Sequence, residues 1–393
     1  MRQVRQWVVA ACAAALVGGF STASSAETPA PAREQATRAT MGRLVDSLVF
    51  VLPLATSDAR FSDPAQREAI LAALAALAEN GAKLESHSQG RDPGFDFLSR
   101  GLARDTQEIH ARFATGRPAE ARFLLLELSD SCAACHSRLP DGRDHPVGRR
   151  LVDDPRVAAL DVQERVRLEV ATRSFDRALA SYEALFADPK RSPGDLDLEG
   201  DVEGYLEVVL RVKNEPARAQ RTFQALSQRK DLPVGMRENV ATWIASLQAL
   251  RDRKAAAPSL AEARRLMAQA QDLARYPDDR AALVLYVEAS SQLHRFLAER
   301  SAPVSERAEA CYLLGVIESR IGRSFWLSQT EFFLERAIRL APQKPFAREA
   351  YDLLVEFETS SYGGATGSEA EVPPDVRARL DELSALIQRA QGD

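Results

Sequence analysis

The chain has 393 residues, of which 45% are hydrophobic and 27% are charged, a balance typical of folded globular proteins rather than disordered chains. Its formal net charge is −5, and no basic cluster with interleaved aromatic residues occurs, so we do not expect nucleic acid as a partner. After the N-terminal segment, no stretch has the roughly 20 unbroken apolar residues of a membrane span.

The N-terminal residues have the pattern of a secretory signal. Two arginines precede an apolar run over residues 7–20, and small residues follow at the positions that signal cleavage requires; these are Arg2, Arg5, Ser24 and Ala26. The pattern predicts a signal peptide over residues 1–26 and export to the periplasm. A rival interpretation is lipidation at Cys12, but the apolar run continues past this residue, which favours an ordinary signal.

Apolar residues then recur at spacings of three and four, which indicates helices throughout. Capping residues and prolines divide the first part into four predicted helices, over about 32–51, 63–88, 92–116 and 118–138. Pro53 is expected to stop the first of them. Because the connections are short, we predict an up-down-up-down four-helix bundle over 32–140. The end of its fourth helix then lies beside the start of the first, the end of the second and the start of the third.

The rest of the chain is predicted to contain a second helical unit. Residues 141–158 are rich in Pro, Gly and Asp and are predicted to form a linker. Residues 159–358 have the pattern of helix pairs, and 359–393 are predicted to form a flexible segment and a C-terminal helix. The expected fold is therefore all-α, a four-helix bundle followed by an α-solenoid-like array of helix pairs.

The strongest chemical motif is Cys132-Ala133-Ala134-Cys135-His136, near the end of the fourth predicted helix. C-x-x-C-H is the attachment signature of c-type haem. Two thiols three residues apart lie on one helix face and can bond the two vinyl groups of the same porphyrin. The adjacent His136 is then placed to ligate the iron. We therefore expect one covalently attached haem c.

Two other functions use a C-x-x-C spacing. A thioredoxin-like redox pair needs a βαβ context, which this sequence lacks. A zinc half-site needs further ligands, for which only His87 and His110 could be recruited. Export also removes Cys12, which leaves an odd number of cysteines. Attachment of two of them to haem leaves Cys311, which we expect to be a small buried residue.

The helix that carries the motif has an apolar stripe. Its members recur at spacings of four and three and are Ala121, Leu125, Leu128, Cys132 and Cys135. A four-helix bundle with this motif at the end of its last helix resembles the cytochrome c-prime family over roughly residues 34–140. The run from Phe95 through Ala103, Ile109, Gly116 and Ala121 to the motif is similar to the last two helices of that family. The resemblance implies attachment at both cysteines, axial ligation by His136, and a sixth iron position that is vacant or held by a Met of the first helix. Met41 matches that Met approximately. The sequence departs from the family at Pro53 and at residues 137–140.

Three alternatives remain for the sixth iron position: ligation by Met41, ligation by His87, or no ligand. Met41 is on the first predicted helix, and His87 is at the end of the second; both are at the end of the bundle that carries the motif. Three arginines are placed where a haem propionate could emerge, namely Arg91, Arg100 and Arg138.

The second unit resembles tetratricopeptide repeats. The run 308–315, followed by Gly322, Ala337 and Pro342, carries the small-residue and proline landmarks of such a repeat. Arrays of this kind often present a concave surface to a peptide or protein. The sequence contains no recognisable set of catalytic residues, so we do not expect an enzyme.

Three functions follow from these patterns. The first is a periplasmic electron-transfer protein whose helical repeats dock a redox partner, after attachment of haem by the cytochrome c maturation machinery. The second is a gas-binding or sensing haem protein with an open iron site. The third is an assembly scaffold in which the haem is ancillary.

Overall fold

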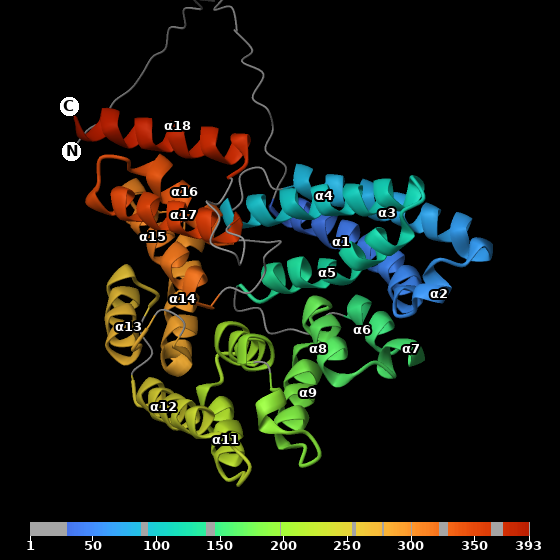
Figure 1. Cartoon of the computed structure of the whole chain (residues 1–393), viewed down its shortest axis with the longest axis horizontal. Helices are drawn as coiled ribbons and strands as arrows, with labels where there is room; N and C mark the ends of the chain where they lie inside the picture. Colours follow the sequence, from blue (N-terminus) through green and yellow to red (C-terminus); the bar gives the residue numbers. More distant parts are fainter. Residues whose placement is uncertain are drawn as a thin grey trace, which may run out of the picture.

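The computed structural model describes residues 30–87, 93–138, 146–196, 198–253, 257–276, 279–299, 301–321, 329–362 and 372–392. The predicted signal peptide over residues 1–26 lies outside these ranges. Within them, the regular structure is entirely helical, which confirms the all-α prediction (Figure 1). None of the described helices combines the length and the apolarity that crossing a membrane requires.

Four long helices near the N-terminus pack against one another in chain order, and the first also contacts the last. They are α1 (Ala30–Ala55), α3 (Arg67–Ser86), α4 (Pro93–Ala114) and α5 (Pro118–His136). A short helix, α2 (Asp58–Phe61), and a 3₁₀ turn (Pro64–Gln66) connect α1 to α3. Gly116, whose φ is +81°, reverses the chain between α4 and α5 in a conformation that suits glycine. These helices form the bundle that the sequence predicts.

The prediction that Pro53 stops the first helix is wrong, because α1 includes Pro53 and continues to Ala55. A proline removes one backbone hydrogen bond within a helix. Here the last turn is held by burial, since Val51 and Ala55 are fully buried. The side chain of Arg122 also donates a hydrogen bond to the carbonyl of Ala55 at 2.6 Å.

Residues 141–158, predicted as a linker, contain two short helices in their described part. These helices are α6 (Pro146–Val152) and α7 (Pro155–Ala158). Leu151 and Val157 are buried in the hydrophobic core of the bundle, together with Leu168 from the next helix. The core of the bundle is therefore completed by residues of the predicted linker itself and by Leu168 beyond it.

The remaining helices form an array in which neighbours along the chain pack together. They are α8 (Val162–Ala171), α9 (Phe175–Ala187), α10 (Glu203–Leu206), α11 (Pro216–Ser227), α12 (Val234–Arg251), α13 (Leu260–Leu273), α14 (Leu283–Ala298), α15 (Val304–Ile321), α16 (Gln329–Leu340), α17 (Pro345–Tyr362) and α18 (Pro374–Gln391). Contacts are most extensive within the pairs α11–α12, α13–α14 and α15–α16. The predicted flexible segment from residue 359 is wrong for its first four residues, because α17 reaches Tyr362. Residues 363–371 lie outside the described ranges.

Two local features shape the array. A Cβ atom added at Gly315 of α15 would lie 2.5 Å from Cδ2 of Leu334 in α16, so glycine permits the close approach of this pair. Two π-helical segments, Leu198–Val202 and Glu207–Val212, flank α10. Such widened turns are rare and often occur at functional positions.

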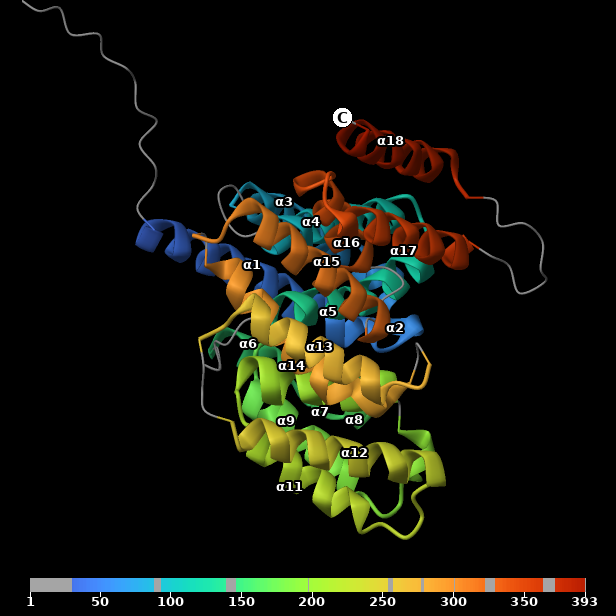
Figure 2. The same ribbon diagram turned by 90° about the vertical axis from the view of Figure 1, so that its left-hand side faces the viewer.

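The array curves so that its later helices return to the bundle, as Figures 1 and 2 show. The rings of Phe97 in α4 and Phe332 in α16 stack with centroids 4.4 Å apart. Helix α5 also contacts α8, and Ala133 of α5 packs against the core of the array. The inner side of the array therefore faces the bundle at both its beginning and its end.

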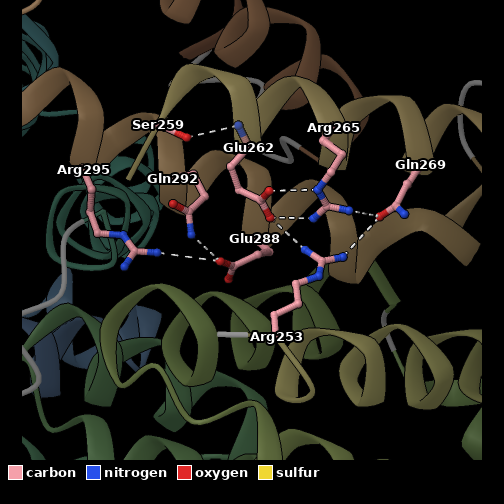
Figure 3. Close-up of polar contacts among 8 residues, drawn as sticks. All are labelled: Arg253, Ser259, Glu262, Arg265, Gln269, Glu288, Gln292 and Arg295. Carbon is pink, nitrogen blue, oxygen red and sulfur yellow. Dashed lines mark hydrogen bonds and ion pairs between the residues drawn. The ribbon is translucent and has the colours of Figure 1, made fainter. Parts of the chain in front are cut away.

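A polar cluster joins the end of α12 to α13 and α14 (Figure 3). We call it the α13 cluster, and it consists of Arg253, Ser259, Glu262, Arg265, Gln269, Glu288, Gln292 and Arg295. Glu262 accepts hydrogen bonds from Arg253 at 2.9 Å and from Arg265 at 2.8 Å. Both arginines also donate to Gln269, at 3.2 and 2.9 Å. Glu288 accepts from Gln292 at 2.7 Å and lies 3.7 Å from Arg295.

Candidate functional site

The three motif residues line a cavity of about 60 Å³ near the C-terminal end of α5. Cys132, Cys135 and His136 are each half-buried. The cavity is bordered by Met41 of α1, Leu84 near the end of α3 and Phe95 near the start of α4. These three positions agree with the neighbours that an up-down-up-down bundle predicts for the end of its fourth helix. Residues of α6 and α8 complete the wall.

The cavity wall is apolar although it contains hydroxyl side chains. Ser99, Ser129 and Thr172 each donate a hydrogen bond to a backbone carbonyl within their own helix, at 3.1, 2.9 and 2.7 Å. The remaining wall residues away from the motif are almost all aliphatic or aromatic. An apolar group of suitable shape would therefore be accommodated without leaving these hydroxyl groups unpaired.

The imidazole of His136 is held by the end of α8. Its Nδ1 lies 2.7 Å from the carbonyl oxygen of Ala171, the last residue of that helix. A carbonyl oxygen can only accept, so Nδ1 carries the proton and donates it. The neutral ring then has its lone pair on Nε2, which is the tautomer that a metal-ligating histidine of this kind requires.

The backbone around Ala171 explains why its carbonyl is available. The amides of residues 172–174 bond the three preceding carbonyls, those of Leu168, Val170 and Glu169. Arg173, with a φ of 62°, turns the chain away in the left-handed region and so ends the helix. The last carbonyls of a helix also carry the negative end of its dipole, which favours a partly positive donor such as this imidazole.

The two motif cysteines are thiols and not a disulfide. Burial raises the pKa of Cys132 to about 12, and the neighbouring Cys135 and Asp130 add to this effect. Reactive cysteines of redox motifs have a lowered pKa, because the thiolate is the nucleophile. The surroundings of Cys132 therefore disfavour a thioredoxin-like activity.

The candidates for a sixth iron ligand are placed differently. Met41 lines the cavity, whereas His87 follows the last residue of α3 and is not among the lining residues. His110, near the C-terminal end of α4, is half-buried and also lies outside the cavity wall. Throughout the described ranges, no three His, Cys, Asp or Glu side chains gather as a metal site.

The three arginines that could contact a haem propionate differ in their exposure to solvent. Arg138 is only 5% exposed, whereas Arg100 is exposed and pairs with Asp96 of its own helix at 2.6 Å. Arg91 lies outside the described residues. Cys311 is buried in α15, as predicted, and burial raises its pKa to about 12.

A buried polar cluster directly after the motif was missed at the level of sequence. We call it the seam cluster, and it consists of Ser137, Arg138, Glu207, Arg211, Ser290, His294 and Glu318. The hydroxyl of Ser137 donates to Glu207 at 3.2 Å, and Arg211 donates to the other oxygen of Glu207 at 2.7 Å. Arg211 also donates to Ser290 of α14 at 2.8 Å. The sequence feature that indicates this cluster is a single arginine, Arg211, within the apolar run 208–212.

The family of the chain is not settled by comparison with known proteins. No protein-family model, no curated protein and no solved structure matches this chain.

Proposed function

We propose that the chain is an exported c-type haem protein that transfers electrons, with haem bonded to Cys132 and Cys135 and with His136 as an axial iron ligand. The observation that carries this proposal is the hydrogen bond from Nδ1 of His136 to the carbonyl of Ala171. Histidines that ligate metals commonly donate their other ring N–H to a carbonyl or carboxylate, which fixes the tautomer and the ring orientation.

The residues around the motif are compatible with a covalently attached porphyrin. Both thiols and the imidazole line the same apolar wall, and a haem requires attachment points, an axial ligand and apolar contacts. The cavity of about 60 Å³ is smaller than a porphyrin, so the lining helices must separate to admit one. Met41, Leu44 and Leu48 of α1 lie opposite the motif and are aliphatic side chains that can repack.

Bound haem would supply the one-electron chemistry, and the chain's own residues set its surroundings. The hydrogen bond to Ala171 makes His136 a more basic ligand, and the apolar wall excludes water from the cavity. Met41 is the candidate for the sixth position, because it is on the wall whereas His87 is not. A gas-binding protein is the second candidate, favoured by the apolar character of the cavity wall.

A partner protein would be expected to bind the outer side of the array. The inner side meets the bundle through contacts such as that between Phe97 and Phe332. The exposed apolar side chains of the array include Val234, Tyr276 and Val304, which are 75%, 58% and 52% exposed. This assignment replaces the concave docking surface that the resemblance to tetratricopeptide repeats suggests.

The test is a haem stain of the denatured mature chain, followed by absorption spectra with and without carbon monoxide. We expect covalent haem in the wild-type chain and none in the Cys132→Ser/Cys135→Ser variant. Low-spin bands that carbon monoxide leaves unchanged support electron transfer, whereas bands that shift with the gas support the second candidate. Absence of stain from a chain matured with the haem-attachment machinery would overturn both.

The sixth ligand is tested by a matched pair of variants. Met41→Leu should convert low-spin bands to high-spin bands, because leucine cannot ligate iron. His87→Leu should leave the bands unchanged, since His87 is not on the cavity wall. The reverse result would reassign the ligand to His87.

The support of His136 by α8 can be tested through Gly148 of α6. A Cβ atom at this position would lie 2.2 Å from the carbonyl oxygen of Thr172, so alanine must displace the end of α8. We expect Gly148→Ala to weaken the bond to His136 and to raise the reduction potential of the haem, because a less basic ligand stabilises the oxidised iron less. Gly42→Ala is the control, since a Cβ there has no neighbour within 4 Å. Equal potentials in the two variants would exclude this role of α8.

A further inference from the structure

An open groove of about 740 Å³ lies between α4 and α5, beside the small cavity that the motif lines. We call it the α4–α5 groove. Part of its wall is apolar and consists of Phe123, Leu124 and Leu128 of α5. The side chain of Phe123 is 49% exposed. Exposed aromatic side chains are frequent contact residues in protein interfaces, so this wall offers an anchor point to a partner.

The α4–α5 groove and the motif cavity share part of their walls. Leu128 and Ser131 line both of them. Residues four apart are neighbours on a helix, and these two residues precede Cys132 and Cys135 by four. Leu128 and Ser131 therefore separate a partner in the groove from a group held in the motif cavity.

The charged side chains of the groove are mostly acidic. Two guanidinium groups are outnumbered by four carboxylates, those of Asp105, Glu108, Glu120 and Glu127. Arg112 is shared between Glu108 and Glu120, and Arg104 lies 3.2 Å from Asp105. From outside the lining, Arg117 lies 3.5 Å from Glu120. Asp130 and Arg167 act on Glu127 with opposite signs. The sum of these charges is negative.

Two of the carboxylates are in surroundings that a further cation would improve. Burial and the neighbouring Asp130 raise the pKa of Glu127, and Arg167 of α8 offsets this only in part. Burial also raises the pKa of Asp105, although Arg104 is beside it. A positive charge placed in the groove would stabilise both carboxylates in their ionised form.

We propose that the α4–α5 groove docks a basic redox partner protein, which places a lysine or arginine side chain beside Asp105 and Glu127 and an apolar side chain against Phe123. Complementary charges guide such partners to the correct surface and speed their association. One electron then passes between the haem and a one-electron carrier of the partner, so that one is oxidised as the other is reduced. This inference rests on the proposed function, because the haem is the electron carrier of the chain.

The exposed apolar residues of the array have a different place in this arrangement. Val234, Tyr276 and Val304 line neither the α4–α5 groove nor the motif cavity. A contact on the outer side of the array would therefore be additional to the one in the groove, where the electron is exchanged.

The first test measures binding of a fluorescent peptide of lysine and leucine, in the haem-loaded chain and in the full Cys132→Ser/Cys135→Ser chain, by fluorescence anisotropy at low salt. Asp105→Asn/Glu127→Gln should weaken binding about threefold or more, because two negative charges are lost. Arg104→Gln should strengthen it, because a positive charge is lost. The control is Asp272→Asn/Glu306→Gln, which makes the same change of net charge at exposed positions outside the groove and should have no effect.

The aromatic contact is tested in the same assay. Phe123→Ala should weaken binding of the peptide, whereas Tyr276→Ala, at a similarly exposed position of the array, should leave binding unchanged. Glu127→Gln alone keeps the test available if the double variant does not fold, which circular dichroism shows.

The second test measures the rate at which the reduced, haem-loaded chain is oxidised, by stopped-flow absorption with two reagents of opposite charge. Asp105→Asn/Glu127→Gln should slow oxidation by tris(phenanthroline)cobalt(III), a cation with aromatic ligands, about threefold or more at low salt. Oxidation by the anion ferricyanide should become faster, because repulsion from the groove is reduced. Both differences should shrink as salt is added.

Equal effects of the groove variants and the array variants on binding and on both rates would show that only net charge matters, and would overturn this inference alone. A wild-type chain that carries no haem would instead overturn the proposed function. The haem stain separates these two failures before any variant is compared.

Discussion

Two polar clusters of the molecule are both built around arginine and glutamate, but they differ in how completely their atoms are paired. In the α13 cluster, Glu262 accepts hydrogen bonds from two arginines, and each of these arginines also bonds Gln269 (Figure 3). In the seam cluster, His294 and one oxygen of Glu318 have no hydrogen-bond partner among the described residues. A network in which every polar atom is paired can hold helices together without a bound ligand. A deeply buried network with open positions is instead a candidate for binding.

Exposure to water differs between the two clusters in the same direction. The side chains of Arg265 and Arg253 are 41% and 28% exposed, whereas that of Arg211 is 2% exposed. Electrostatic interactions are screened at the first site and strong at the second. The comparison therefore predicts large effects of substitution at the seam and small ones in the α13 cluster.

The largest expected difference is between Arg211→Ala and Arg265→Ala. Loss of Arg211 leaves Glu318 buried without its closest cation and Ser290 without its donor. We expect this change to lower the free energy of unfolding by about 3–5 kcal/mol. Loss of Arg265 should cost at most about 1 kcal/mol, because Glu262 keeps Arg253. Urea unfolding followed by circular dichroism measures both, and equal losses would contradict the distinction between the clusters.

The next effect is a pH dependence with opposite signs at Glu318 and His294. Because the pKa of Glu318 is raised from 4.5 to about 7, this residue stabilises the folded state at low pH. That contribution is lost as the pH rises to about 7. Relative to wild type, Glu318→Gln should therefore gain about 3 kcal/mol of stability between pH 4.5 and 7.

His294 changes the stability of the folded state with pH in the opposite direction. Its pKa is lowered by burial and by the two arginines of the seam, so it stabilises the folded state above about pH 6.5, and this contribution is lost on acidification. His294→Gln should accordingly gain stability relative to wild type as the pH falls below 6.5. In the α13 cluster, Glu288→Gln should behave like Glu318→Gln with a smaller slope, because Gln292 donates to the Glu288 carboxylate. Parallel slopes for Glu318→Gln and His294→Gln would refute this assignment.

The smallest expected effects concern one serine in each cluster. Ser137 donates to Glu207, and Ser259 caps α13 by accepting from the amide of Glu262 at 3.2 Å. Replacement of either by alanine should cost about 1 kcal/mol. Only Ser137→Ala is expected to change the absorption spectrum and the reduction potential of the haem-loaded chain, since only Ser137 adjoins His136. Identical spectra for the two variants would show that the seam cluster does not influence the haem site.

The sequence predicts the bundle well because its signals are local. Prolines and acidic caps mark the helix starts; Asp63, for example, accepts a hydrogen bond from the amide of Ala65 at 2.9 Å. The apolar stripe of α5 and the topology of the bundle correctly bring Met41 to the wall that the motif residues line. Pro53 was misjudged because burial of the last turn outweighs the loss of one hydrogen bond.

The surroundings of the motif were less predictable, because they depend on residues distant in the chain. The carbonyl of Ala171 carries no side-chain signal, and its availability follows from the way α8 ends. Glu207 and Glu318 are far apart in the chain and are joined through Arg211 only by the packing of the array. His294 has no partner for chemistry in the sequence alone; its burial among arginines is a property of the fold.

The return of the array to the bundle also bears on when the motif can be reached during synthesis. Once α8 lies against α5, and α16 lies against α4, the wall that contains Cys132 is covered on the side of the array. Roughly 200 residues separate the motif from the end of α16, so under the proposed export the bundle crosses the membrane before the helices that cover it. An enzyme that modifies Cys132 and Cys135 has this interval to act on an open bundle. After this interval, modification must compete with packing of the array against the bundle.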